Sequence, residues 1–157
     1  MLDRALLYDF QLAGSKKRLW KRRGESYEHV LMKALGFAMY APKYPELAIE
    51  QDVNLRYRPD LSARSEDGRF VFWGECGATS ARKINWLLKH AGVERLVLFK
   101  IDRGVAQLAV ELRTQIAPRY RAPGRLRIIN FAADVVTQTA SRQIDSVPPH
   151  WYTQVDV

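Results

Sequence analysis

Two carboxylates at the ends of neighbouring predicted strands are the residues best suited to chemistry. The stretch RPDLSARSEDGRFVFWGEC, residues 58–76, reads as two short strands joined by a turn, with Asp60 near its start and Glu75 near its end. Asp67-Gly68 is a strong signal for a two-residue hairpin loop, because a type I′ turn requires positive φ at both central positions. With that loop, Asp60 falls directly opposite Glu75.

The same register sorts the side chains of the hairpin into two faces. One face carries Leu61, Ala63, Phe70, Phe72, Gly74 and Cys76, and the other carries Asp60, Ser62, Arg64, Val71, Trp73 and Glu75. Opposed residues have Cβ atoms about 4.5–5.5 Å apart, where like charges are destabilising. A divalent cation between the two carboxylates would offset this repulsion, and Mg²⁺ is commonly held by one or two carboxylates plus substrate phosphates.

A purely structural interpretation of the two carboxylates remains open. Asp60 follows Pro59 and is able to open the strand with a turn hydrogen bond. Glu75 is able to pair with one of the many arginines of the chain. A bulge or a longer loop would also shift the register by one residue.

The elements that position this pair follow from hydrophobic periodicity and chain breakers. A first helix is predicted after Gly24, with Pro42 and Pro45 ending it and a buried stripe at Val30, Leu31, Ala34, Leu35 and Ala38. Thr79 or Ser80 caps a second helix that Gly92 ends, and a third covers residues 105–116. Strands are predicted at 6–12, 49–57, 61–65, 69–76, 94–101 and 126–131, followed by a short helix and an irregular tail. The run LVLF in 94–101 is typical of a central strand covered on both faces. This order predicts an α/β fold built on a mixed sheet flanked by helices.

At this point the residues resemble a known superfamily. Pro59-Asp60, an apolar strand, and Glu75 ahead of a helix are similar to the PD-(D/E)XK nuclease pattern. Within it, the chain is most similar to the YaeQ family, through ESYEHVLMKALGFAM, RPDL, the strand ending in WGECG, and ARKINWLLKHAGVERLVLF. The resemblance implies a restriction-endonuclease-like αβββαβ core and cleavage of phosphodiesters with Mg²⁺ or Mn²⁺. It also implies metal ligands at Asp60 and Glu75, with Glu28 at the acidic position of the first helix.

One position departs from that pattern. A lysine is expected two residues after the glutamate, and this chain has Gly77 there. Arg82 and Lys83, at the start of the next helix, are able to place a positively charged side chain at the site in its stead. Lys83 would then stabilise the attacked phosphate and orient the water. Glu28 would complete the metal shell or hold a metal-bound water. The rival acid, Glu25, is interpreted as structural, because the helix dipole favours an acid there.

A dense basic run precedes the first helix. The segment KKRLWKRR, residues 16–23, has six basic residues and one aromatic, in a chain of net charge +8 and pI near 9.8. Its cations would meet phosphates while the tryptophan stacks on a base; a solvated segment is the alternative. The predicted nucleic-acid contacts are Lys16, Lys17, Arg18, Trp20, Lys21, Arg22, Arg23 and Arg82.

Length and composition set the remaining bounds. A chain of 157 residues fits a single domain covering 1–157. The only cysteine, Cys76, excludes an internal disulfide and a cysteine-based zinc cluster, and it is expected to be a small buried hydrophobe. Without a signal peptide or an apolar run near 18 residues, a cytoplasmic protein without a membrane partner is expected. His29, His90 and His150 are expected in surface or core roles.

Three functional hypotheses follow. The first is a metal-dependent nuclease that binds and cuts nucleic acid. The second is a catalytically inactive nuclease-fold module that binds nucleic acid or protein, having lost the motif lysine. The third is an adaptor for a partner protein, in which the positive charge serves solubility alone.

Overall fold

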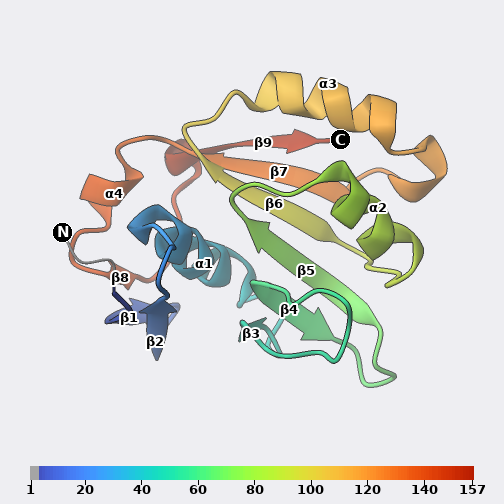
Figure 1. The fold of residues 1–157 in the computed structure, drawn as a ribbon. Helices are drawn as coiled ribbons and strands as arrows, with labels where there is room; N and C mark the ends of the chain where they lie inside the picture. Colours follow the sequence, from blue (N-terminus) through green and yellow to red (C-terminus); the bar gives the residue numbers. More distant parts are fainter. Residues whose placement is uncertain (1–3) are drawn as a thin grey trace.

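A six-stranded mixed sheet forms the centre of the fold (Figure 1). The computed structural model describes residues 4–157. The strand order is β3-β4-β5-β6-β7-β9, with β5, β6 and β7 parallel and the other neighbours antiparallel. The strands are β3 (Ala48–Ile49), β4 (Leu61–Arg64), β5 (Phe70–Cys76), β6 (Leu96–Ile101), β7 (Leu126–Phe131) and β9 (Tyr152–Asp156). The mixed α/β architecture expected from the sequence is confirmed.

Helices cover both faces of this sheet. They are α1 (Tyr27–Tyr40), α2 (Ala81–Lys89), α3 (Val105–Gln115) and α4 (Val135–Gln138), with 3₁₀ turns at Pro118–Tyr120 and Pro149–Trp151. Apolar residues of α2 and α3 pack on one face, and those of α1 and α4 pack on the other. The hydroxyls of Ser26 and Ser80 cap α1 and α2 by accepting from the N–H groups three residues on. Within residues 4–157, no helix is long and apolar enough to cross a bilayer.

A second, smaller sheet lies against α1 (Figure 1). It has the order β2-β1-β8, with β1 at Leu6–Leu12, β2 at Ser15–Lys21 and β8 at Gln143–Ile144. The β1–β2 hairpin turns on Ala13 and Gly14, which both have positive φ, as a two-residue loop requires. The sequence predicted β1, but it gave no strand for the basic run, which in fact forms most of β2.

Because it lies between the two sheets, α1 is buried almost all round. Every residue of its predicted stripe is buried, and so are Met32, Phe37 and Tyr40 on other sides of the helix. A helix that is apolar all round belongs in a core rather than at a surface. It packs tightly against the large sheet at Gly36, where a methyl group would lie 2.8 Å from Leu61 Cδ1 and 2.9 Å from Phe99 Cζ.

The β4–β5 hairpin differs from its predicted turn but keeps the predicted pairing near the site. Ser65 N donates to Arg69 O, which leaves a three-residue loop ending in Gly68 at φ +86°. A bulge at Val71, the extra residue of β5, then shifts the register back, so Leu61 pairs with Gly74 as predicted. The two irregularities cancel. The prediction that Phe70 shares a face with Phe72 is wrong, because the bulge turns Phe70 toward Trp73 and the α2 side. That side is also not a polar face, since Trp73 and Ser62 are buried.

Two other segments correct the sequence prediction. The strand expected at 49–57 ends after Ile49, because Glu50 and Asn54 adopt positive φ and turn the chain away. The C-terminal tail, expected to be irregular, instead adds β9 to the edge of the sheet beside β7. The remaining predicted strands and helices are present, with ends shifted by a few residues at most.

The contact at Gly36 gives a stability prediction. In Gly36→Ala, overpacking should cost about 1–3 kcal/mol, against a gain in helix propensity of about 1 kcal/mol. We expect a net loss, with a lower melting temperature by a few degrees, and a larger loss for Gly36→Val. Thermal melts check this, with Gly104→Ala as a control whose new methyl meets no atom within 4 Å. A Gly36→Ala protein as stable as the parent would contradict the packing described.

Candidate functional site

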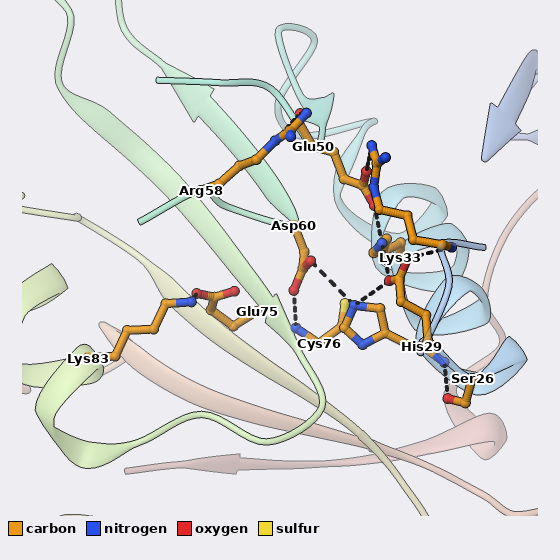
Figure 2. Close-up of polar contacts among 11 residues, drawn as sticks. Ser26, His29, Lys33, Glu50, Arg58, Asp60, Glu75, Cys76 and Lys83 are labelled. Atoms are coloured by element: carbon orange, nitrogen blue, oxygen red, sulfur yellow. Dashed lines mark hydrogen bonds and ion pairs between the residues drawn. The ribbon is translucent and has the colours of Figure 1, made fainter. Parts of the chain in front are cut away.

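Asp60 and Glu75 come together at the carboxyl end of β5 (Figure 2). Asp60 directly precedes β4, and Glu75 is the last but one residue of β5. Since Leu61 pairs with Gly74, the next residue outward on each strand brings the two carboxyl groups beside each other. Asp60 Oδ2 also accepts a hydrogen bond of 2.8 Å from the backbone N–H of Cys76. The juxtaposition of the two carboxyl groups predicted from the sequence is therefore present.

Lys83 is the cation beside Glu75. Glu75 is only 3% exposed, and its Oε1 forms an ion pair with Lys83 Nζ. The Lys83 ammonium also lies 5.0 Å from the ring centre of Tyr57, which packs edge-on against Trp86 at 5.3 Å. The Ser80 cap sets the first turn of α2, from which Lys83 reaches the strand. The sequence predicted this convergence from a neighbouring helix.

The two carboxyl groups have opposite pKa shifts. Burial raises the pKa of Glu75 to about 7, and the charge of Asp60 adds to the rise, while Lys83 opposes it. Burial also acts to raise the pKa of Asp60, but the contacts from His29 and the Cys76 N–H outweigh it and hold that pKa below its usual value. In a pair of this kind, Asp60 ionises first and Glu75 loses its proton only as the pH passes through about 7.

On the α1 side, His29 links Asp60 to a second acid. His29 Nε2 lies 3.5 Å from Asp60 Oδ1 and 3.2 Å from Glu25 Oε2. The same Glu25 oxygen accepts a 3.0 Å hydrogen bond from Lys33 Nζ. Glu25 was interpreted from the sequence as a dipole-favoured structural residue; in the fold it lies one contact away from the carboxyl pair.

Lys33 is a buried charge held by two carboxylates. It is 1% exposed, and its ammonium contacts Glu50 as well as Glu25. Burial acts to lower the pKa of Lys33, but the bonds to Glu50 and Glu25 outweigh it, so the pKa is raised and the lysine stays charged.

Two arginines complete this network. Arg58 donates to the carbonyl of Glu50 through Nε at 3.0 Å and Nη2 at 2.7 Å, and Arg22 Nη2 reaches Glu50 Oε2 at 3.3 Å. The backbone N–H of Glu50 donates to the Asp60 carbonyl at 2.9 Å, which ties the network to the carboxyl pair. Four acids, at 25, 50, 60 and 75, thus meet four cations, at 22, 33, 58 and 83.

The donor set available to a metal consists of two carboxylates. Within residues 4–157, no group of three or more His, Cys, Asp and Glu side chains is arranged to hold a metal ion. Asp60 and Glu75 alone are hard oxygen donors, which suit Mg²⁺ or Mn²⁺ when water and a substrate phosphate supply the other ligands.

The other predicted site residues lie apart from the pair. Glu28 is exposed and lies on the wall of a different hollow, and Arg82 is exposed at the start of α2. Sequence reasoning missed the network of His29, Lys33 and Glu50. Lys33 gave one usable signal, because a lysine next to the apolar stripe of a buried helix requires an acidic partner.

The basic run has two faces because it forms a strand. Trp20 is 49% exposed and Lys16 and Arg18 are exposed with it, whereas Lys17 turns inward over the ring of Phe37 at 5.0 Å. Arg18 pairs with Asp9 across the hairpin at 3.0 Å. The predicted nucleic-acid contacts on this strand therefore divide into the outward side chains of Lys16, Arg18 and Trp20 and the inward side chain of Lys17.

A surface depression leads from this strand to the carboxyl pair. A hollow of about 450 Å³ is lined by Trp20 and Arg22 of the basic run and by Glu50 and Arg58. An adjoining hollow of about 270 Å³ shares Arg22, Glu50 and Arg58 and extends to Asp60. Cations therefore line this path together with the carboxylates of Glu25 and Glu50, and the path ends at Asp60.

The raised pKa of Glu75 gives a prediction about stability and pH. Its pKa is about 7 in the folded protein against 4.5 ordinarily, so the folded state binds the proton more tightly. That contribution is fully present below about pH 4.5 and is lost as the pH rises through 7, by roughly 3 kcal/mol at most. We expect urea denaturation in EDTA to show this loss in the parent and not in Glu75→Gln.

The matched control is Glu46→Gln, an exposed glutamate away from the site. It should follow the pH profile of the parent. If Glu75→Gln and the parent lose stability in parallel between pH 5 and 8, Glu75 is not the buried, proton-holding member of the pair.

Comparison with known proteins places the chain in a family. A family profile described as "YaeQ protein" matches residues 15–146. The YaeQ protein structure from Xanthomonas axonopodis pv. citri superposes with a TM-score of 0.60 at 14% identity, covering 99% of this chain and 96% of that one. The Pseudomonas syringae YaeQ protein structure gives 0.61 at 17% identity, covering 98% and 93%. A search of curated proteins returned no match. At 14% and 17% identity, the two structures establish a similarity of fold alone. The family profile spans most of the sequence, and the chain therefore belongs to the YaeQ protein family.

Proposed function

We propose that this protein is a metal-dependent nuclease-fold phosphodiesterase that acts on nucleic acid. The observation that carries the proposal is the convergence of Asp60, Glu75 and Lys83 from three different elements on one buried point. The order α1-β3-β4-β5-α2-β6 supports a restriction-endonuclease-like core, since it has the αβββαβ sequence of elements implied by the resemblance.

Mg²⁺ or Mn²⁺ fits the chemistry of the pair. Asp60 and Glu75 would hold it, and their mutual repulsion would be relieved by a cation between their oxygens. When bound, such an ion activates water and neutralises charge on a phosphate. Because the pKa of Glu75 is raised to about 7, part of the free protein carries a proton on Glu75 at neutral pH, and metal binding would release it.

The remaining side chains have distinct roles in this proposal. The Lys83 ammonium, already at Glu75, would donate to a phosphate oxygen brought to that carboxylate. His29 fixes the orientation of Asp60, and the Cys76 N–H holds its other oxygen. Glu28, which lines a different hollow, has no direct role at the pair in this proposal.

The proposed substrate path is the depression from Trp20 to Asp60. Exposed Trp20 offers a stacking platform, and Arg22 and Arg58 line the path that follows. Stacking on an aromatic ring combined with cations along a backbone is the usual way in which single-stranded nucleic acid is bound. Cys76, buried and unpaired, is compatible with the reducing cytoplasm that we propose for the protein.

A second candidate is a nucleic-acid-binding module without catalysis. It is favoured by the ion pairs of the site, because Lys83 and His29 already occupy the carboxyl groups that a metal would need. In that case the network serves stability, and Gly77 marks the loss of the motif lysine.

A cleavage assay tests the nuclease. Plasmid, duplex and single-stranded DNA and RNA would be incubated with Mg²⁺ or Mn²⁺. We expect cleavage by the parent and a loss of about 100-fold or more in Asp60→Asn, Glu75→Gln and Lys83→Met. Lys89→Met, on the exposed end of α2, is the matched lysine control and should cleave like the parent.

Thermal melts of the same proteins separate the two candidates. A divalent ion bound only by the folded state should stabilise it by about 2.7 kcal/mol at a hundredfold excess over its dissociation constant. We expect the parent to show this gain and the two amide variants to lose it. Absence of cleavage, together with the same response to metal in all three proteins, would leave the binding module.

Nucleic-acid binding should depend steeply on salt. If about six cations meet phosphates, affinity should fall about 10³-fold or more between 50 and 200 mM salt. Lys16→Gln should reduce the slope of log K against log salt by about 0.7–0.9. Trp20→Ala should weaken single-strand binding at every salt concentration and leave the slope unchanged.

Fluorescence anisotropy with a labelled single strand measures the salt dependence of the parent, the slope for Lys16→Gln and the affinity of Trp20→Ala. Lys43→Gln, in the turn after α1, is the control cation and should keep the parent slope. A salt-independent affinity would remove nucleic acid as the partner and leave the adaptor hypothesis.

A further inference from the structure

A separate cavity of about 540 Å³ lies beyond the carboxyl ends of β5 and β6. These two strands are parallel, so their ends point to the same edge of the sheet (Figure 1). The start of α1, the β5–α2 turn and the β6–α3 connection all contribute to its walls. The volume is in the range of sites that take small organic ligands, and the position is where open α/β sheets bind them.

Lys100 is a buried lysine on the wall of this cavity without an acidic partner. It is 9% exposed, and its ammonium donates to the carbonyl of Gly77. Within residues 4–157, no carboxylate lies within 4.0 Å of its Nζ, in contrast to Lys33, which has two. A buried cation is costly unless an anion compensates it. The place next to Lys100 is therefore suited to an anionic group from outside the chain.

Arg103 and Gly77 also shape the cavity near the Lys100 ammonium. Arg103 lines the same wall, and its backbone is fixed from both sides by Asn130, which accepts from its N–H at 3.2 Å and donates to its carbonyl at 3.0 Å. Gly77 has φ +84°, and a methyl group there would lie 3.4 Å from His29 Nδ1. A side chain at position 77 would be strained, and its first carbon would lie against the ring of His29, which also lines the cavity.

The rest of the lining is not that of a simple anion site. Met32 and Leu108 add apolar surface, and the exposed carboxylate of Glu28 stands at the α1 side. A phosphate ion would fill a small part of this volume. An apolar surface with a carboxylate acceptor suits a ring system with a sugar or amino group that donates hydrogen bonds.

We propose that this cavity binds a phosphorylated nucleoside, with its phosphate on Lys100 and Arg103, its base against Met32 and Leu108, and its hydroxyl or amino donors on Glu28. The phosphate has two possible sources. One is a free mononucleotide, and the other is the terminal phosphorylated nucleotide of a strand. Only the second source rests on the proposed nuclease function.

Isothermal titration in EDTA tests this site without metal or catalysis. The probes are AMP, adenosine, inorganic phosphate, and a short oligonucleotide with and without a 5′-phosphate. We expect AMP or the 5′-phosphorylated strand to bind, and each to bind more tightly than its unphosphorylated counterpart and than inorganic phosphate. Binding of AMP assigns the free nucleotide, and binding of the phosphorylated strand without AMP assigns the strand end.

Variants connect the binding to the cavity. Lys100→Met should weaken binding about tenfold or more, since a charge-assisted contact is lost. Because it removes a buried unpaired charge, it should melt no lower than the parent. Lys89→Met, on the exposed end of α2, is the matched lysine control and should bind like the parent. Equal affinity in Lys100→Met, equal binding of AMP and adenosine, or no saturable binding of any probe would overturn the assignment.

Discussion

The buried ammonium of Lys33 is the interaction on which the site depends. A charge that is 1% exposed must be compensated, and Glu25 and Glu50 do so from two segments that are distant in sequence. Glu25 in turn contacts His29, and the backbone of Glu50 pairs with that of Asp60. One salt-bridge requirement in α1 therefore fixes the segment before the helix, the loop after β3, and the carboxylate at the start of β4.

The layered fold determines where chemistry is possible. The large sheet is covered by α1 and α4 on one face and by α2 and α3 on the other, so its faces are core. Charged side chains are then found at the edges of the sheet: Asp60 directly precedes β4, and Glu75 and Lys100 are each the last but one residue of their strands. His29 connects the carboxyl pair to the cavity beside Lys100, because it contacts Asp60 and also lines the cavity.

The β4–β5 hairpin shows why local signals predicted the site better than the details around it. Asp67-Gly68 indicated a turn at the correct place, although the loop has three residues and not two. The bulge at Val71 cancels that difference, so the pairing at Leu61 and Gly74 is the predicted one. Burial on both faces of the sheet favours this correction, because a one-residue slip would exchange core and surface side chains along the strand. The predicted orientation of Phe70 was wrong, because Phe70 lies between the three-residue loop and the bulge, where the pairing differs by one residue from the prediction.

The sequence by itself determined most helices and central strands, the Asp60–Glu75 pairing and the return of a cation at Lys83, because periodicity, caps and turn residues act over a few positions. The tertiary structure alone decided that Glu25 and Glu50 meet on Lys33, that the tail forms β9 and that the basic run forms a strand. It also decided that Lys100 lies buried beside Gly77. The Lys33 network, β9 and the burial of Lys100 depend on contacts between separate segments of the chain, whose energies come from burial and from the pairing of edge strands. The basic strand is different, because it pairs with β1 across the two-residue loop at Ala13 and Gly14, and its many charges hide the strand from hydrophobic periodicity.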